Sequence, residues 1–234
     1  MTLMLSSQRP FAQGGNRLCF VHPKHPDRCV KVRRPDFSLE ARRRKKGFPK
    51  NLKPLSSFDD NLEEFHVMQQ LEQQFGMPIF NLISRCYGFE DTDMGRGLTS
   101  ELIRDHSGHI SHTLKQYLWD HDHTEDSQHA VNTFCNQWID LGVPSRDLLL
   151  HNIVAQRNHK GLIVRLVLID GLGNQNILPM WLQPLTLRRN KARRKTENLR
   201  ERIEALVNQR GADTFPGFHG QLFHEGVEDK DHEQ

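Results

Sequence analysis

The sequence predicts an α+β protein in which a half built on a β-sheet precedes a mostly helical half. Up to about residue 103, short runs rich in β-branched and aromatic residues alternate with turn formers, and a single amphipathic helix interrupts them. Beyond that point apolar residues recur at three- and four-residue spacing, with one further hairpin. Because strands and helices are segregated along the chain rather than alternating, an α+β arrangement is favoured over a doubly wound α/β sheet.

The first half contains two predicted hairpins around one helix. The runs "RLCFVHP" and "DRCVKV" flank a turn that contains Pro and Asp, and "ISRCYGFEDTD" and "GLTSELI" form the second pair. Between them, "SFDDNLEEFHVMQQLEQQFG" places Leu62, Phe65 and Leu71 on one helical face. Asp59 or Asp60 is the expected cap, and Gly76 ends the helix. The basic stretch "ARRRKKGFPK" before this helix is expected to be a loop.

The second half is predicted to hold two helices, a hairpin and a basic helix. "SHTLKQYLWDH" and "SQHAVNTFCNQWIDLG" are amphipathic, and Gly142 and Pro144 end the second of them. "NIVAQ" and "LIVRLVLIDG" form the hairpin. The expected organisation is therefore an N-terminal lobe at 1–103, a helical lobe at 104–186, a basic helix at 187–210 and a flexible acidic tail at 211–234.

Composition limits the class of protein. Hydrophobic residues make up 36% of the chain and the formal net charge is +3, which is too small to impose a nucleic-acid partner. No window approaches the ~18 apolar residues of a membrane span, so no transmembrane segment is expected. The N-terminus lacks the pattern of a signal peptide, and a cytoplasmic location is expected.

The basic segment "LRRNKARRKTENLRER" has two interpretations. Its later arginines alternate with glutamates at helical spacing, as on an ordinary salt-bridged surface. Alternatively, an anionic partner binds at Arg188, Arg189, Arg193 and Arg194, in which case the protein is an adaptor for nucleic acid or a membrane surface.

Glycines and polar residues interrupt or end the apolar runs in an informative order. A phosphoryl-transfer site needs backbone donors over the phosphates, a lysine, an acid that orients the lysine, an aspartate near the attacking hydroxyl, and oxygen ligands for magnesium. Each of these roles has a candidate in the matching order: Gly14, Gly15, Lys31, Glu64, Asp147, Asn152 and Asp170. The alternative is that Lys31 is a solvated charge and that Asp147 and Asn152 bond the backbone of a turn.

These motifs resemble the protein-kinase-like superfamily. "QGGNRLCFVHPKHPDRCVKV" resembles a glycine-rich loop followed by the strand lysine, "SRDLLLHN" resembles the catalytic loop H-R-D-L-x-x-x-N, and "LIDG" stands where D-F-G would be. More closely, "QGGNRLCFVHP", "SRCYGFEDTDMGRGLTSELI" and "VLIDGLGN" resemble the bacterial YrbL family, small kinase-like proteins associated with the PhoP regulatory network. The resemblance covers nearly the whole chain up to the basic helix.

The resemblance implies a bilobal kinase-like fold that binds ATP and Mg²⁺ between its lobes and transfers the γ-phosphoryl group to a hydroxyl. Glu64 is preferred to Glu63 as the partner of the lysine, because Glu64 keeps the apolar Met68 and Leu71 four and seven residues further on. Carried over residue by residue, the implied site consists of a phosphate loop (Gly14, Gly15, Asn16), a phosphate-binding catalytic lysine (Lys31) oriented by Glu64, a hinge under the adenine (Glu101 to Ile103), a catalytic carboxylate (Asp147) and two magnesium ligands (Asn152, Asp170).

The sequence also departs from the kinase pattern. The phosphate loop is a bare Gly-Gly, Ser145 replaces the catalytic-loop histidine, and leucine stands two residues after Asp147 where kinases commonly have lysine. These departures also fit a pseudokinase that acts as a regulatory or nucleotide-sensing module. No A-P-E motif follows Asp170, so a small hydroxylated metabolite or a lipid headgroup is at least as plausible an acceptor as a protein side chain. The sequence determines neither the acceptor nor the oligomeric state.

Overall fold

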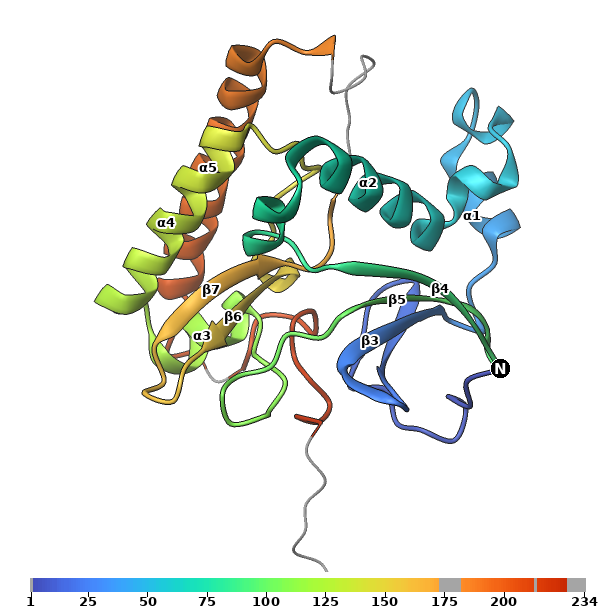
Figure 1. The fold of residues 1–234 in the computed structure, drawn as a ribbon, viewed down its shortest axis with the longest axis horizontal. Helices are drawn as coiled ribbons and strands as arrows, with labels where there is room; N and C mark the ends of the chain where they lie inside the picture. The colour runs from blue at the N-terminus through green and yellow to red at the C-terminus, as the bar shows by residue number, and fades with distance from the viewer. Residues whose placement is uncertain (1, 173–181, 213, 227–234) are drawn as a thin grey trace, which may run out of the picture.

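The computed structural model describes residues 2–172, 182–212 and 214–226, and Figure 1 shows one group of strands at the right and a separate pair of strands at the left beside three helices. The strands are β1 (Ala12–Gln13), β2 (Arg17–His22), β3 (His25–Arg33), β4 (Cys86–Thr92), β5 (Gly95–Glu101), β6 (Ile153–Arg157) and β7 (Ile163–Leu168). The α-helices are α1 (Leu39–Lys46), α2 (Asp60–Phe75), α3 (Leu114–His121), α4 (Glu125–Leu141) and α5 (Leu185–Val207). This mixture confirms the predicted α+β class.

The first five strands form one antiparallel sheet in the order β1-β2-β3-β5-β4. Both predicted hairpins, β2–β3 and β4–β5, are present. On β3, Val30 and Val32 are fully buried and pack with Leu5 and Phe20. Because side chains alternate between the two faces of a strand, Lys31 points to the opposite face of the sheet.

Helix α2 lies against β4 and β5, as Figure 1 shows. Asp59 caps it by accepting from the N–H groups of Asn61 and Leu62, and Gly76 ends it at φ 63°, a conformation that favours glycine. Met68 and Leu71 are buried in the main core. The face that carries these apolar residues also turns Glu64 toward the sheet.

The basic stretch at 41–50 is not a simple loop, contrary to the prediction, because most of it belongs to α1. Ser38 caps this helix by accepting from Ala41 N–H, and Glu40 in the first turn and four basic residues in the last turn complement the helix dipole. No residue of α1 is buried. The helix therefore lacks the apolar periodicity by which the others were predicted.

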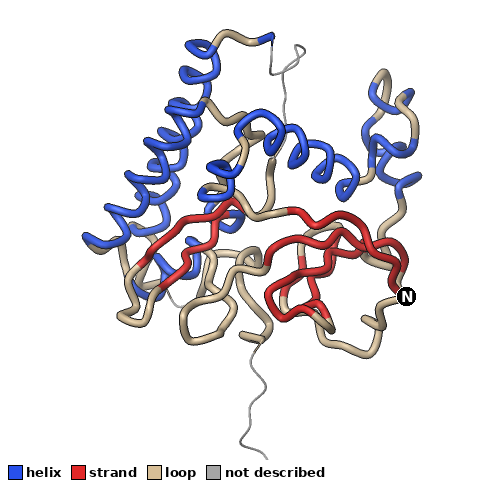
Figure 2. The backbone as a smooth tube through the Cα atoms, in the orientation of Figure 1, coloured by secondary structure: helices blue, strands red, loops and turns tan. Residues whose placement is uncertain are grey.

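The remaining helices form the main core together with the β6–β7 hairpin (Figure 2). Trp138 of α4 is fully buried, and Leu199 and Ile203 of α5 belong to the same cluster. Helix α5 begins at Leu185 and ends at Val207, so it is displaced by two to three residues from the predicted 187–210. No helix among the described residues combines the length and the apolar character needed to cross a bilayer.

The chain beyond α5 differs from the predicted flexible tail. Residues 214–226, here called the C-terminal segment, pass between the sheet half and the helical half, where Figure 1 shows them in red. Phe223 N–H donates to Phe11 O at 2.7 Å, and Glu225 O accepts from Ile110 N–H at 2.9 Å. Residues 227–234 of the predicted tail lie outside the described residues.

Candidate functional site

A buried ion pair joins the sheet to α2. Lys31 Nζ lies 2.6 Å from Glu64 Oε1, and the two side chains are 6% and 5% exposed. Lys31 also donates to Ile169 O at 2.7 Å, which ties β3 to the segment after β7. Burial is the largest influence and lowers the pKa of Lys31, but the negative charges of Glu64 and Asp170 act together against it, and the net result is a pKa above the ordinary value. The lysine is therefore charged, and it is not the solvated surface residue of the alternative interpretation.

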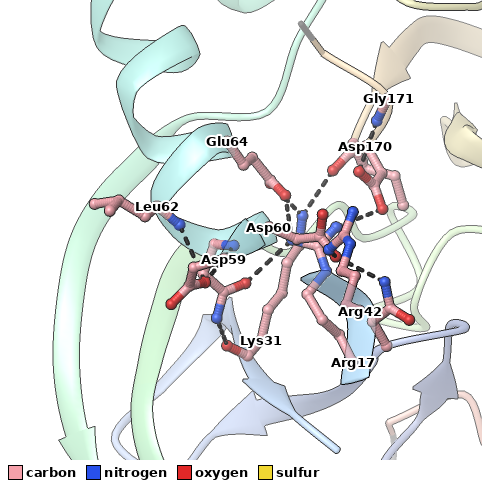
Figure 3. A network of polar contacts seen from close by, with 12 residues as sticks. Arg17, Lys31, Arg42, Asp59, Asp60, Leu62, Glu64, Asp170 and Gly171 are labelled. Carbon is pink, nitrogen blue, oxygen red and sulfur yellow. Dashed lines mark hydrogen bonds and ion pairs between the residues drawn. The ribbon is translucent and has the colours of Figure 1, made fainter. Parts of the chain in front are cut away.

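Arg17, which follows the glycine turn, is a member of this site that sequence reasoning missed. Figure 3 shows its guanidinium between Glu64 and Asp170. It forms an ion pair with each of them, at 2.5 Å from Asp170 Oδ2, although its own side chain is only 11% exposed. The sequence signal available was its place two residues after the Gly14-Gly15 pair, which by itself does not distinguish a site residue from a surface arginine.

Asp170 follows β7 and faces both cations. Its Oδ1 accepts from Gly171 N–H at 2.6 Å, and its Oδ2 accepts from Arg17. Burial raises the pKa of Asp170, but the positive charges of Arg17 and Lys31 and the hydrogen bonds to its carboxylate lower that pKa well below its usual value. Because the side chain is 47% exposed, solvent screens these interactions, and Asp170 is a charged group accessible from the cleft.

The loops that carry Asp147, Asn152 and Asp170 are in direct contact. Arg146 N–H donates to Gly171 O at 3.2 Å, and Ile169 N–H donates to Asn152 O at 2.8 Å. A Cβ at Gly171 would lie 2.8 Å from Asn152 Nδ2, and Gly171 has φ +79°. Close packing and backbone conformation both require glycine after Asp170, so the Asp-Gly dipeptide is more than a common turn. Asn152 and Asp170 offer hard oxygen ligands to the same cleft, a donor type that suits Mg²⁺.

Asp147 lies beside the cleft, and its carboxylate faces α5. Arg202 Nη2 lies 2.7 Å from Asp147 Oδ2, and Lys195 Nζ lies 3.9 Å from Oδ1. The side chain also accepts from Leu148 N–H at 3.1 Å, and it is 33% exposed. The predicted catalytic carboxylate is thus positioned by the basic helix, a relationship that the sequence motif does not contain.

The glycine turn leaves open space at its surface. Gly14 N–H donates to Arg17 O at 2.9 Å, which closes the turn between β1 and β2. A Cβ at Gly15 would meet nothing within 4 Å, and one at Gly14 would meet only Arg17 O at 3.9 Å. Packing within the chain therefore does not require glycine at these two positions. A ligand that comes close to the backbone of the turn would require it. The side chain of Asn16 is engaged elsewhere, because it donates to Asp60 Oδ2 at 2.8 Å.

Two adjoining hollows collect all the predicted site residues except Asp147. One, of about 140 Å³, lies between the halves of the molecule and includes Lys31, Glu101, Ile103, Asn152 and Asp170. The other, of about 180 Å³, lies at the glycine turn and includes Gly14, Gly15, Asn16, Glu64 and Asp170. Gly14, Arg17 and Asp170 line both hollows, so they form one cleft.

Glu101 and Ile103 lie at the predicted place, where the sheet half joins the helical half. Both oxygens of the Glu101 carboxylate have partners within the protein. Oε1 lies 2.7 Å from Arg165 Nη2, and Oε2 accepts from Arg85 N–H. Ile103 O accepts from Ser111 N–H at 3.0 Å. The hinge is therefore fixed to both halves of the molecule by hydrogen bonds.

The C-terminal segment forms one wall of the cleft. His219, Gly220, Gln221 and Leu222 line the hollow between the halves. Leu222 packs on a cluster that contains Cys29 and Leu102. Thr113 Oγ1 donates to Gly220 O at 2.7 Å, and the rings of His151 and His219 stack with centroids 5.3 Å apart. With the segment in this place, the hollow between the halves has a volume of about 140 Å³, below the ~300 Å³ at which small-molecule sites usually begin.

The family profile and the similar proteins found by comparison point to the same family. The profile of the family "PhoP regulatory network protein YrbL" matches residues 3–204. The chain is also 24% identical to the YrbL proteins of Escherichia coli (strain K12) and Shigella flexneri, over 197 residues that cover 81% of this chain and 83% of each relative. Since the family profile spans most of the sequence, including every residue of the cleft up to Asp170, the chain belongs to the YrbL family of PhoP regulatory network proteins.

Proposed function

We propose that the protein is a phosphotransferase of the protein-kinase-like type, which binds ATP with Mg²⁺ in the cleft and transfers the γ-phosphoryl group to a hydroxyl. One observation carries the proposal: the buried Lys31–Glu64 ion pair at 2.6 Å faces the same cleft as Asn152 and Asp170. The sheet order β1-β2-β3-β5-β4, with α2 packed beside it, supports a bilobal kinase-like fold. The family match adds the PhoP regulatory network as the context.

Each residue of the cleft has a role in this proposal. Lys31 and Arg17 are the cations available to the triphosphate, and Glu64 holds both in place. The Gly14 N–H is used to close the turn, but the open surface over Gly14 and Gly15 lets the backbone of the turn come close to the phosphates. Asn152 and Asp170 would hold Mg²⁺, which neutralises phosphate charge when bound. Asp170 is already held in its charged form by Arg17, which would release it when a metal binds.

Asp147 is the group that accepts the proton of the acceptor hydroxyl. As the hydroxyl oxygen bonds to the γ-phosphorus, the bond from that phosphorus to the β–γ bridging oxygen breaks and ADP departs with the electron pair. The proton moves to Asp147, whose carboxylate is partly exposed and is oriented by Arg202 and Leu148 N–H. The reaction then yields a phosphate ester and ADP.

The first test is a calorimetric titration of ATP into the protein with and without Mg²⁺. We expect magnesium-dependent binding in the wild type, and at least about a tenfold loss in Lys31→Met and in Asp170→Asn, because each removes one charged contact worth ~1.4 kcal/mol or more. Lys24→Met is the matched control, because Lys24 is exposed in the turn between β2 and β3.

Circular dichroism and thermal unfolding of each variant separate a lost contact from a lost fold. Equal affinity in the wild type and both cleft variants, with all proteins folded, would contradict the proposed site. If ATP does not bind even after removal of the C-terminal segment, the pseudokinase alternative is favoured. In that case the protein acts as a regulatory module through its surface and does not use the cleft for catalysis.

Removal of the C-terminal segment is expected to increase the affinity for Mg·ATP about tenfold. The apparent dissociation constant rises in inverse proportion to the fraction of molecules whose cleft is open, so a segment that fills the cleft nine-tenths of the time weakens binding about tenfold. Leu222→Asp tests the same contact without shortening the chain, since it places a charge in the cluster with Cys29 and Leu102. Phe218→Asp is the control, because Phe218 is 63% exposed. Unchanged affinity in both the truncated protein and Leu222→Asp would show that the segment does not compete.

A further inference from the structure

A second depression lies between α5 and the loop that leads to Asp147. This α5 groove has a volume of about 580 Å³ and shares no lining residue with the cleft. Its volume is typical of small-molecule sites, which occupy ~300–1,000 Å³. It is lined by Gly142, Val143, Pro144, Ser145, Gln183, Arg188, Lys191, Ala192, Arg194, Lys195, Glu197, Asn198 and Glu201.

Positive charge dominates the α5 groove. Four of its lining residues are basic and two are acidic. Arg188, Lys191 and Lys195 are spaced three and four residues apart, so they form one stripe along α5. At the same spacing the stripe continues through Asn198 to Arg202, the residue that contacts Asp147. The charged stripe therefore leads from the groove to the proposed catalytic carboxylate.

Two side chains around the groove, Arg188 and Ser145, carry buried polar atoms with no hydrogen-bond partner among the described residues, although the guanidinium of Arg188 lies over the ring of Phe75 at 5.6 Å. Nε and Nη1 of Arg188 and Oγ of Ser145 are buried without a hydrogen bond. Burial and the neighbouring charge of Arg189 lower the pKa of Arg188. A bound anion would satisfy these donors and offset the repulsion, because charge-assisted hydrogen bonds are the strong ones.

Lys195 connects the groove with the catalytic loop. It lines the groove, its Nζ donates to Arg146 O at 2.5 Å, and the same Nζ lies 3.9 Å from Asp147 Oδ1. The catalytic loop itself has leucine two residues after Asp147. Helix α5 thus supplies the cation that the loop lacks.

We propose that the α5 groove binds the acceptor, a small phosphate monoester with a free hydroxyl. Its phosphate lies on the stripe of Arg188, Lys191 and Lys195, and its hydroxyl reaches Asp147. The inference rests on the proposed function. The hydroxyl gives its proton to Asp147 and gains the γ-phosphoryl group of ATP, so the product carries two phosphate groups.

The structure separates the basic residues of α5 into two sets. Arg189 donates to Asp140 O at 3.0 Å through both Nε and Nη2, and Arg193 donates to Asn190 Oδ1 at 3.2 Å, so these two residues lie outside the groove. Arg188 and Arg194 line it. Of the four arginines expected to contact an anionic partner, only two face one bounded site, which favours a small molecule over a long polyanion.

Calorimetric titration without ATP tests the groove, with inorganic phosphate and glycerol 3-phosphate as probes and glycerol as the uncharged match. We expect both phosphates to bind the wild type and glycerol not to bind. Affinity should fall at least about tenfold in the double variant Arg188→Gln/Lys195→Met, which removes two of the charged contacts proposed for the phosphate. Arg193→Gln, on the same helix but outside the groove, should bind as the wild type does. Mg·ATP binding, measured separately, should remain unchanged in all three proteins.

The outcomes separate this inference from the proposed function. Mg·ATP binding without binding of either phosphate would overturn the acceptor site alone. Phosphate binding in the groove of a protein that never binds Mg·ATP would overturn the acceptor assignment together with the proposed function. An equal loss in Arg193→Gln would indicate a general charge effect and contradict the groove. Tight binding of RNA that weakens steeply with salt and falls in Arg193→Gln would instead favour the adaptor.

Discussion

Asp147→Asn is expected to lower the rate of phosphoryl transfer about 10³-fold while Mg·ATP binding changes by less than about twofold. A positioned general base contributes ~10²–10⁴-fold to such reactions, and asparagine keeps the shape of aspartate but does not accept the proton. Asp147 lines neither hollow of the cleft, so nucleotide contacts are preserved. The measurement is single-turnover release of labelled phosphate from γ-labelled ATP, with water as the acceptor.

Asp140→Asn is the matched control for this experiment. Asp140 is an exposed residue of α4, and it is its backbone carbonyl, not its carboxylate, that accepts from Arg189. We expect its turnover to equal that of the wild type. Retention of wild-type turnover in Asp147→Asn would remove Asp147 from the mechanism. The ion pairs of Asp147 with Arg202 and Lys195 are partly exposed, so their loss is expected to cost no more than about 1 kcal/mol of folding free energy.

Glu64→Gln is expected to lower the free energy of unfolding by about 3 kcal/mol, because removing one partner of a buried ion pair leaves the other charge uncompensated. Here Lys31 loses its carboxylate partner and Arg17 keeps only its ion pair with Asp170, while the two side chains are 6% and 11% exposed. Urea denaturation monitored by circular dichroism measures the effect.

The adjacent Glu63→Gln provides the comparison. Glu63 pairs with Arg146 at the surface, where the two side chains are 39% and 41% exposed, so its loss is expected to cost less than about 1 kcal/mol. The contrast tests the assignment of Glu64, rather than Glu63, as the partner of Lys31. Similar destabilisation by both substitutions would contradict it.

Local sequence signals predicted most of the fold. Helix α2 was predicted from its apolar spacing, with Asp59 as one of two candidate caps and Gly76 as its end, because these signals act within a few residues of one another. The β2–β3 hairpin followed from its turn residues and β-branched runs. Helix α1 was missed because it buries no residue and relies on a cap and on charge. Residues 173–181, part of the stretch after Asp170 in which no A-P-E motif was found, lie outside the described residues.

The sequence predicted those residues of the candidate site that belong to a recognisable motif. The order Gly14, Lys31, Glu64, Asn152 and Asp170 pointed to residues that do line one cleft. Arg17 has no such motif, and it reaches Asp170 across 153 positions of the chain. Asp147 was expected to face the cleft, but its carboxylate pairs with Arg202, 55 residues further on.

The sequence by itself determined the α+β class, most of the elements and most of the residues that gather at the cleft, because periodicity, caps and turns depend on neighbouring residues. Only the tertiary structure decided which charges pair, that α5 supplies cations to Asp147, and that the C-terminal segment lines the cleft. The physical reason is that a charged or apolar side chain can pair with many residues of suitable type, and tertiary packing decides which of them lies near it. Leu222 meets Cys29 and Leu102 only after the sheet, the hinge and α5 are in place.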